Sequence, residues 1–262
     1  MDLILDYKSL DRLYNEINII DQYGCAERQQ DLWKRSTESF IGIPVNKESI
    51  EMAKYRYPRT LPKRPTNVEN DYGCSVKTKV YSEYDGYDMN MERLHDGLPY
   101  LHNIVKQHGK NVGKFVRIVV NVAENCNIEA DQMIIKADTA ITILDMLEEQ
   151  GKRVEIVLAD ATEDPGWING KEVDLLYITT VIKKFEDTLN RQLIATSISP
   201  WLFRYHLLAL YDAKMRTRNG HGHAISIPKR FQDPENIYID NLQCLNKHDS
   251  GEFIERITKK RE

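Results

Sequence analysis

The segment FVRIVVNVA, residues 115–123, opens the part of the chain whose pattern decides the fold. Its near-continuous run of β-branched residues is typical of a strand buried on both faces. Residues 130–150 follow with an apolar stripe at helical spacing, and Gly151 offers this helix a C-terminal stop. RVEIVLADA, residues 153–161, reads as a second strand. The order predicts a right-handed parallel strand–helix–strand crossover, with the first strand central in its sheet.

Later segments extend this unit. The stretch TEDPGWINGK, residues 162–171, is dense in turn formers and precedes the strand-like VDLLYITTVI, residues 173–182. So short a link favours an antiparallel hairpin. Further patterns predict helices at residues 183–192, 199–215 and 250–262 and a short strand at residues 236–240. The expected fold class is α/β, with a doubly wound, mostly parallel sheet and an antiparallel edge hairpin.

The N-terminal part has a different pattern. Apolar residues recur at roughly helical spacing through residues 1–35, and residues 58–75 are rich in Pro, Asn and Gly. We therefore expect three parts. They are a mainly helical extension with a Pro-rich linker over residues 1–75, a connecting segment over residues 76–113 and the α/β domain over residues 114–262.

Composition excludes several classes of protein. The 262 residues carry 36 basic and 40 acidic side chains, a net charge of -4, which argues against a chain devoted wholly to nucleic acid. No apolar run reaches the ~18 residues of a membrane-spanning helix, and the N-terminus lacks the pattern of a signal peptide. The four cysteines are far apart and form no CxxC pair. We expect free thiols in a reducing cytoplasm and no membrane partner.

From Phe115 onward the order resembles a von Willebrand factor A-like (vWA) domain. NVAEN, residues 121–125, stands where that family places its Asp-x-Ser-x-Ser, and residues 143–161 resemble the family's first helix and second strand. The hairpin resembles the family's antiparallel edge. More narrowly, the chain resembles an uncharacterised group of bacteriophage proteins, in which a segment like YDMNMERLHDGLP, residues 87–99, precedes the first core strand.

This resemblance implies a metal site that the sequence has lost. The three ligand positions read Asn121, Ala123 and Asn125, so an amide replaces the anchoring carboxylate and the first hydroxyl is missing. Asp240, the last residue of the predicted strand NIYID, is one remaining carboxylate. Because Mg²⁺ prefers anionic oxygen ligands, we expect a degenerate site and no cofactor. The other interpretation is that Asn121 and Asn125 cap the following helix and shape its entry loop.

Two further groups of side chains lie between the last long helix and the last strand. His221 and His223 alternate and could face one side of a strand to bind Zn²⁺ or Ni²⁺, although no third ligand is evident nearby. The same stretch holds basic residues that could contact phosphate: Lys214, Arg216, Arg218, Lys229 and Arg230. The alternative for the histidines is a flexible solvated loop, and for the basic residues it is a solvated loop or a protein-binding edge.

The expected function follows from these features. No P-loop, GxGxxG, GxSxG or HExxH motif occurs in the sequence. The first hypothesis is a phage-encoded, non-enzymatic interaction or adaptor module, in the host cytoplasm or the virion. Its loops near residues 123–130 and 241–250, with residues 193–200 as a further candidate, would bind a protein. The resemblance implies a virion component or an ATPase of phage or host as partner. The alternatives are a nucleic-acid-binding protein using the loop 214–230, and a metal-dependent enzyme using Asp240, Glu124 and the two histidines.

Overall fold

A computed structural model gives the structure of the protein, and it describes residues 1–22, 38–44, 46–63, 77–82, 88–89, 101–106, 115–217 and 221–259. The strands of the main sheet are β1 (Asp2–Tyr7), β5 (Phe115–Asn121), β6 (Arg153–Ile168), β7 (Lys171–Lys183), β8 (Arg216–Thr217), β9 (His223–Ala224) and β10 (Ile237–Ile239). A smaller antiparallel sheet contains β2 (Lys77–Ser82), β3 (Asp88–Met89) and β4 (Leu101–Lys106).

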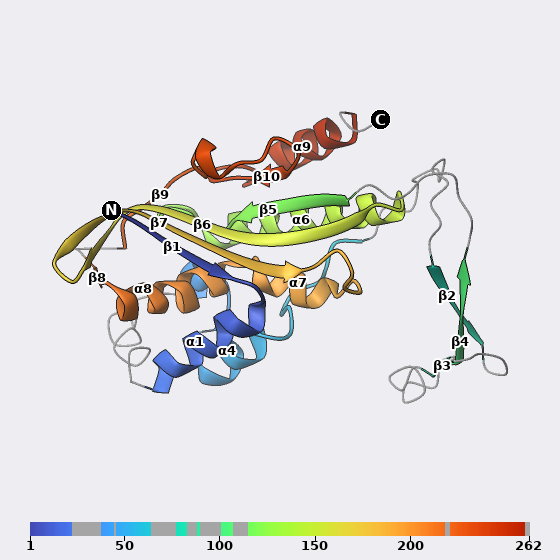
Figure 1. Ribbon diagram of the computed structural model, residues 1–262, viewed down its shortest axis with the longest axis horizontal. Helices are drawn as coiled ribbons and strands as arrows, with labels where there is room; N and C mark the ends of the chain where they lie inside the picture. The colour runs from blue at the N-terminus through green and yellow to red at the C-terminus, as the bar shows by residue number, and fades with distance from the viewer. Residues whose placement is uncertain are drawn as a thin grey trace.

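The described helices are α1 (Leu10–Gln22), α3 (Glu38–Ile41), α4 (Lys47–Ala53), α6 (Ala130–Glu149), α7 (Arg191–Ser197), α8 (Leu208–Lys214) and α9 (Lys247–Lys259). A π-helix, η1 (Leu202–Leu207), runs directly into α8, and a 3-10 turn, η2 (Lys229–Phe231), follows β9. The main sheet has seven strands in the order β1-β7-β6-β5-β10, with β8 and β9 paired to β6 (Figure 1). The protein is therefore α/β, as the sequence predicts.

The central crossover is confirmed. Strand β5 lies between β6 and β10 and is parallel to both, while β6 and β7 form the antiparallel hairpin. Helix α6 begins with a capping box between Glu129 and Gln132, and Gly151 follows its end with a φ of 74°. These local signals place the helix where the apolar stripe predicts it.

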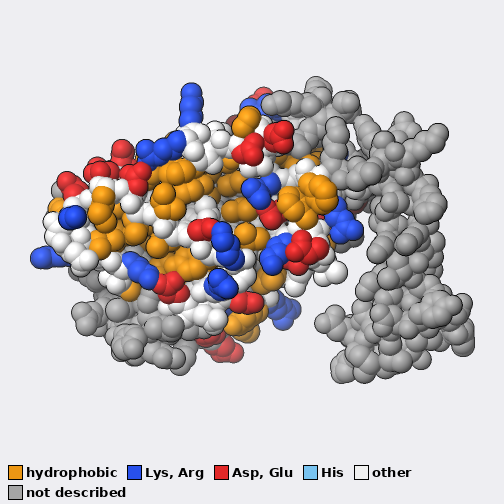
Figure 2. Space-filling model, in the orientation of Figure 1, with side chains coloured by type: hydrophobic (Ala, Val, Ile, Leu, Met, Phe, Trp, Pro, Cys, Tyr) orange, Lys and Arg blue, Asp and Glu red, His pale blue; other side chains and the backbone are white. Residues whose placement is uncertain are grey.

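The helices cover one face of the sheet. Alternate β5 side chains, Val116, Ile118 and Val120, share the main core with residues of α1, α4, α6, α7 and α8. On the other face a smaller cluster is covered by the segment around Ile227 and Phe231, which stacks on Tyr177 with 4.6 Å between ring centroids. A doubly wound sheet needs helices on both faces, so that part of the prediction is wrong for the described residues. Figure 2 shows hydrophobic side chains lying between charged ones on the surface.

The chain starts with a strand and not with a helix. Leu3, Leu5 and Tyr7 alternate with more exposed residues, which is the period of a strand, and β1 pairs in parallel with β7. The edge of the sheet is therefore β1, so the predicted edge hairpin lies inside the sheet. The predicted helix is confirmed only from Leu10. Residues of β1 and α1 belong to the main core, while the predicted boundaries near residues 75 and 113 lie outside the described residues.

The hairpin is longer than the turn formers suggest. The turn itself is Asn169–Gly170, with φ values of 52° and 78°, which suits a type I′ hairpin. Pro165 and Gly166 lie within β6, next to a register shift in its pairing with β7. A β-bulge tolerates proline inside a strand, which explains why these residues do not end it. The predicted helix at residues 183–192 is wrong, because α7 begins only at Arg191, after the N-cap Asn190.

Candidate functional site

The carboxyl ends of β5 and β10 enclose a buried ammonium group. The Nζ of Lys136, on α6, donates to the main-chain oxygens of Asn121 at 3.1 Å and Asp240 at 2.9 Å, and it also pairs with the Glu124 carboxylate. Three acceptors surround this nitrogen, and a neutral amine has only two hydrogens to donate. This arrangement fits an ammonium ion, which has one hydrogen for each acceptor. We call these groups the Lys136 site.

The Lys136 site joins two loops. The Glu124 carboxylate also accepts hydrogen bonds from the main-chain N–H of Leu242 at 3.1 Å and from Nδ2 of Asn241 at 3.3 Å. Lys136 and Glu124 are both buried. Burial lowers the pKa of Lys136, and the adjacent Glu124 carboxylate opposes this shift. The loop after β5 and the loop after β10 are thus fixed to each other through one buried ion pair.

The predicted metal positions come together here, in a structural role. Asp240 accepts hydrogen bonds from Nδ2 of Asn121 at 2.9 Å and from the main-chain N–H of Ile227 at 3.0 Å. The Asn121 Oδ1 accepts from the N–H of Ala123 at 3.1 Å, and the Asn125 Oδ1 accepts from another main-chain N–H at 3.1 Å. These side chains hold the strand ends to the segment before η2. The alternative that Asn121 and Asn125 cap the helix is wrong, because Glu129 caps it. Its other part, that they shape the entry loop, agrees with the hydrogen bond between Asn121 and Ala123.

Sequence reasoning missed Lys136. One sequence feature could have identified it. Lys136 lies four residues before Ala140 on α6, and residues at i and i+4 share a face, so Lys136 lies on the buried face of the helix. Across the described parts of the chain, no group of three or more His, Cys, Asp or Glu side chains could hold a metal ion.

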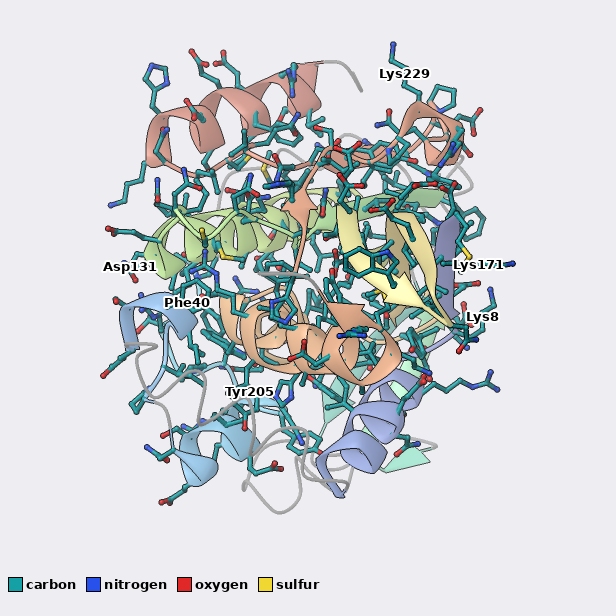
Figure 3. The ribbon with its side chains drawn as sticks, turned by 90° about the vertical axis from the view of Figure 1, so that its left-hand side faces the viewer. Lys8, Phe40, Asp131, Lys171, Tyr205 and Lys229 are labelled. Carbon is teal, nitrogen blue, oxygen red and sulfur yellow. The ribbon has the colours of Figure 1, made fainter. Side chains whose placement is uncertain are left out.

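A second buried cation supports the loop after β5. Arg204, on η1, is 2% exposed and donates to the main-chain oxygens of Phe40 at 2.7 Å, of Ile128 and of Asn125 at 3.3 Å. Its guanidinium lies 4.1 Å from the centre of the Phe40 ring, and Figure 3 labels Phe40 on α3. Burial lowers the pKa of Arg204 to about 10, so it remains charged at neutral pH. The loop is held at both ends by a positive charge.

A buried carboxylate on the neighbouring strand has different partners. Asp160, on β6, accepts hydrogen bonds from the hydroxyl of Tyr211 and from that of Thr162 at 3.0 Å. Asp160 is fully buried, and burial raises its pKa to about 6, against the opposing effect of the two hydroxyls. We call these three side chains the Asp160 site. It ties β6 to α8.

The two histidines lie beside the Asp160 site. The Nε2 of His221 is 2.9 Å from Oδ1 of Asp212, and its ring centroid is 6.0 Å from that of Tyr211. His223, on β9, is exposed and lies opposite Glu163 of β6. Between the two histidines, Gly222 has a φ of 88°, and a Cβ there would lie 2.3 Å from the Glu163 carbonyl oxygen. The structure thus gives His221 an acidic partner, and the metal hypothesis stays a prediction.

The basic residues contact separate elements. Lys214 pairs with Glu16 of α1, and Arg230 pairs with Asp2 of β1. Lys229 points away from the body of the protein in Figure 3. Arg216 lies in β8, opposite Trp167, and Arg218 is outside the described residues. Two of the five predicted phosphate contacts are already paired with carboxylates, and nucleic-acid binding stays a prediction.

Fold and site together define an α/β protein with a mixed sheet, whose carboxyl edge carries an internal ion pair. The chain belongs to the family described as Domain of unknown function (DUF7192), whose model matches residues 2–262. No curated protein and no solved structure matches the chain. Among the described helices, none has the length and apolar character needed to cross a membrane.

Proposed function

We propose that this DUF7192 chain is a non-enzymatic protein-interaction module, and that its partner binds the loops after β5 and β10. The observation that carries the proposal is Leu242, a large apolar side chain that is 58% exposed at a φ of 58°. Its main-chain N–H is bound by Glu124 of the Lys136 site. The protein holds an apolar side chain in solvent on a rigid loop, which suits a contact residue in an interface.

The backbone conformation supports this role. A branched residue at positive φ is strained, and such strain is maintained where the surroundings determine the conformation and function uses it. On either side of Leu242, Asn241 and Cys244 are buried, and Cys244 also has a positive φ of 57°. These anchors leave Leu242 little freedom. A rigid contact loses little conformational entropy on binding, which favours affinity.

The surface around Leu242 is better suited to binding a protein than to binding a polyanion. The exposed side chains next to Leu242 and in the loop after β5 are neutral or acidic: Gln243, Cys126, Asn127 and Glu129. A partner with an apolar pocket and amide-binding groups fits this chemistry. The vWA-like character of the domain, a virion component or an ATPase as partner, and a place in the host cytoplasm or the virion are parts of this proposal that rest on the resemblance of the sequence.

Leu242→Ser tests the proposal against Met52→Ser, a matched control. Met52 is 54% exposed and lies on α4, away from both loops. Proteins captured by the wild-type chain from cells that express it would be identified by mass spectrometry. Each would then be purified and its Kd measured against all three forms. We expect Leu242→Ser to weaken binding at least tenfold, about 1.4 kcal/mol, and Met52→Ser to leave it unchanged. Equal Kd values for both variants, or no captured partner, would contradict the proposal.

A further inference from the structure

The oxygens around Lys136 are positioned without help from the lysine. Strands β5 and β10 are paired in parallel, with Ile239 opposite Val120, so the pairing itself brings the next carbonyls, of Asn121 and Asp240, side by side. Glu124 is fixed independently by the N–H of Leu242 and by Nδ2 of Asn241. The backbone and the loops therefore build a preformed cage of oxygen atoms, in which the Glu124 carboxylate is the charged group that contacts the cation.

We propose that this cage is a monovalent-cation site of the fold, which the Lys136 ammonium fills as a tethered cation. A chain without that ammonium would bind a free cation of similar size and charge, K⁺ or NH₄⁺, at the Asn121 and Asp240 carbonyls and the Glu124 carboxylate. The wild-type loops then need no external cation. The free cation would bind the altered chain whether or not a partner protein binds the loops.

The dimensions of the cage select the class of cation. The Nζ of Lys136 lies 3.1 Å and 2.9 Å from the two main-chain oxygens. Mg²⁺ requires oxygens at about 2.0–2.1 Å and Ca²⁺ at about 2.3–2.6 Å, so either ion would need the paired strand ends to close around it. Rings of main-chain carbonyls are the ligands that bind K⁺ in selective channels. Of the two nearby carboxylates, only that of Glu124 contacts the Lys136 Nζ, while that of Asp240 is bound by Asn121 and by main-chain N–H groups.

Lys136→Ala tests the inference, because it removes the ammonium group and leaves empty the space that the methylene groups of the lysine occupied. Thermal unfolding would be followed in chlorides of choline, Na⁺, K⁺ and NH₄⁺ at equal ionic strength. Choline is too large for the cage and serves as the reference. For Lys136→Ala we expect a saturable rise in Tm with K⁺ or NH₄⁺, of roughly 3–6 °C at ten times the Kd. Lys136→Met fills the stem space with an apolar chain and should show no such rise.

Lys183→Ala is the matched control at another buried lysine. Lys183 is 3% exposed, and its Nζ donates to the Val154 carbonyl at 2.8 Å and pairs with Glu148 at 2.8 Å. Glu148 is 26% exposed, so water can replace the ammonium there, and we expect no cation-specific rise. The double variant Glu124→Gln/Lys136→Ala, whose cage is neutral, should also be insensitive to the cation.

Three outcomes would overturn the inference. One is an equal rise in Tm for Lys136→Ala and Lys136→Met. A second is a rise that persists in the Glu124→Gln/Lys136→Ala double variant, which would place the cation elsewhere. The third is a Lys136→Ala chain that stays unfolded in all four salts while the double variant folds, because a free cation would then have failed to replace the ammonium.

Discussion

Two buried carboxylates on neighbouring strands, Glu124 after β5 and Asp160 in β6, are stabilised in different ways. Glu124 faces an ammonium ion and two N–H donors. Asp160 faces two hydroxyls. Charge on Glu124 is compensated inside the protein, whereas the charge on Asp160 is solvated only by neutral dipoles, and burial raises the pKa of Asp160 to about 6. The first holds two loops together through an ion pair, and the second titrates close to pH 6.

Removing the cation of the Lys136 site should give the largest effect. In Lys136→Met, Glu124 is left buried without a compensating charge, which typically costs about 3–5 kcal/mol of the free energy of unfolding. Urea denaturation measures this loss. The double variant Glu124→Gln/Lys136→Met removes the isolated charge, and we expect it to recover a large part of the loss. A single variant that loses less than about 1 kcal/mol would show that Glu124 does not depend on the ammonium.

The Asp160 site should give the next largest effect, which is a change of stability with pH. Stability should fall as the pH rises, whereas a salt-bridged carboxylate makes it rise. The folded pKa of about 6 lies above the unfolded value of about 3.9, so between these pH values the folded state binds more protons. The contribution of Asp160 to stability therefore falls as the pH rises from 4 to 6, by up to about 3 kcal/mol.

Asp160→Asn tests this prediction, because the amide cannot titrate. The free energy of unfolding of both proteins would be measured by urea denaturation at several pH values from 4 to 7. We expect the difference between wild type and variant to change by about 2–3 kcal/mol across this range, with the wild type relatively more stable at pH 4. Other titrating groups act on both proteins and cancel in the difference. Parallel profiles would mean that Asp160 does not titrate in this range.

Backbone strain also differs between the loop bound by Glu124 and the hairpin that contains Asp160. Leu242, bound to Glu124, and Asn169, at the turn of the hairpin that contains Asp160, both have positive φ. A left-handed conformation costs a branched residue about 1–2 kcal/mol, whereas asparagine tolerates it. We expect Leu242→Gly to raise the free energy of unfolding by about 0.5–1 kcal/mol, and Asn169→Gly to change it less. Chemical denaturation of the two variants measures both, and an equal gain in each would mean that Leu242 is not strained.

The two carboxylate sites also show what the sequence could predict. The strand at residues 115–123, the helix and the next strand follow from local periodicity and capping, which act over a few residues. The closeness of Asn121 to Asp240 follows from the rule that parallel strands end at one edge. Lys136 could not be assigned, because the partners of a buried lysine come from segments over 100 residues apart, as its bond to Asp240 shows. The contact between Asp160 and Tyr211 could not be predicted either, because it depends on how α8 packs against the sheet.

Tertiary contacts also explain where the fold predicted from the sequence was wrong. The β1 segment has apolar residues that fit a helix when counted together with those of α1, and only pairing with β7 selects the strand. Pro165 reads as a strand breaker, and a bulge accommodates it. The absence of helices from the second face of the described sheet depends on the segment around Ile227, whose place is set by a hydrogen bond to Asp240. The bulge and the hydrogen bond to Asp240 leave no periodic signal in the chain, whereas the alternation of Leu3, Leu5 and Tyr7 in β1 is one.

The smallest expected effect is the response to Mg²⁺. A divalent ion at the carboxyl edge would need the oxygens of Glu124 and Asp240, and these already accept hydrogen bonds from the Lys136 ammonium and from main-chain N–H groups. The fixed ammonium also repels a second cation, and Asn121 contributes an amide where the ion would need a charge. We expect no specific heat in a calorimetric titration at millimolar Mg²⁺, and a Tm unchanged by a chelator.

Lys136→Ala should likewise prefer K⁺ to Mg²⁺, since its cage keeps the wide spacing set by strand pairing. Specific Mg²⁺ binding by the wild-type chain that is lost in Asp240→Asn would show that the edge opens to take a metal, and would favour the metal-dependent alternative over the interaction module.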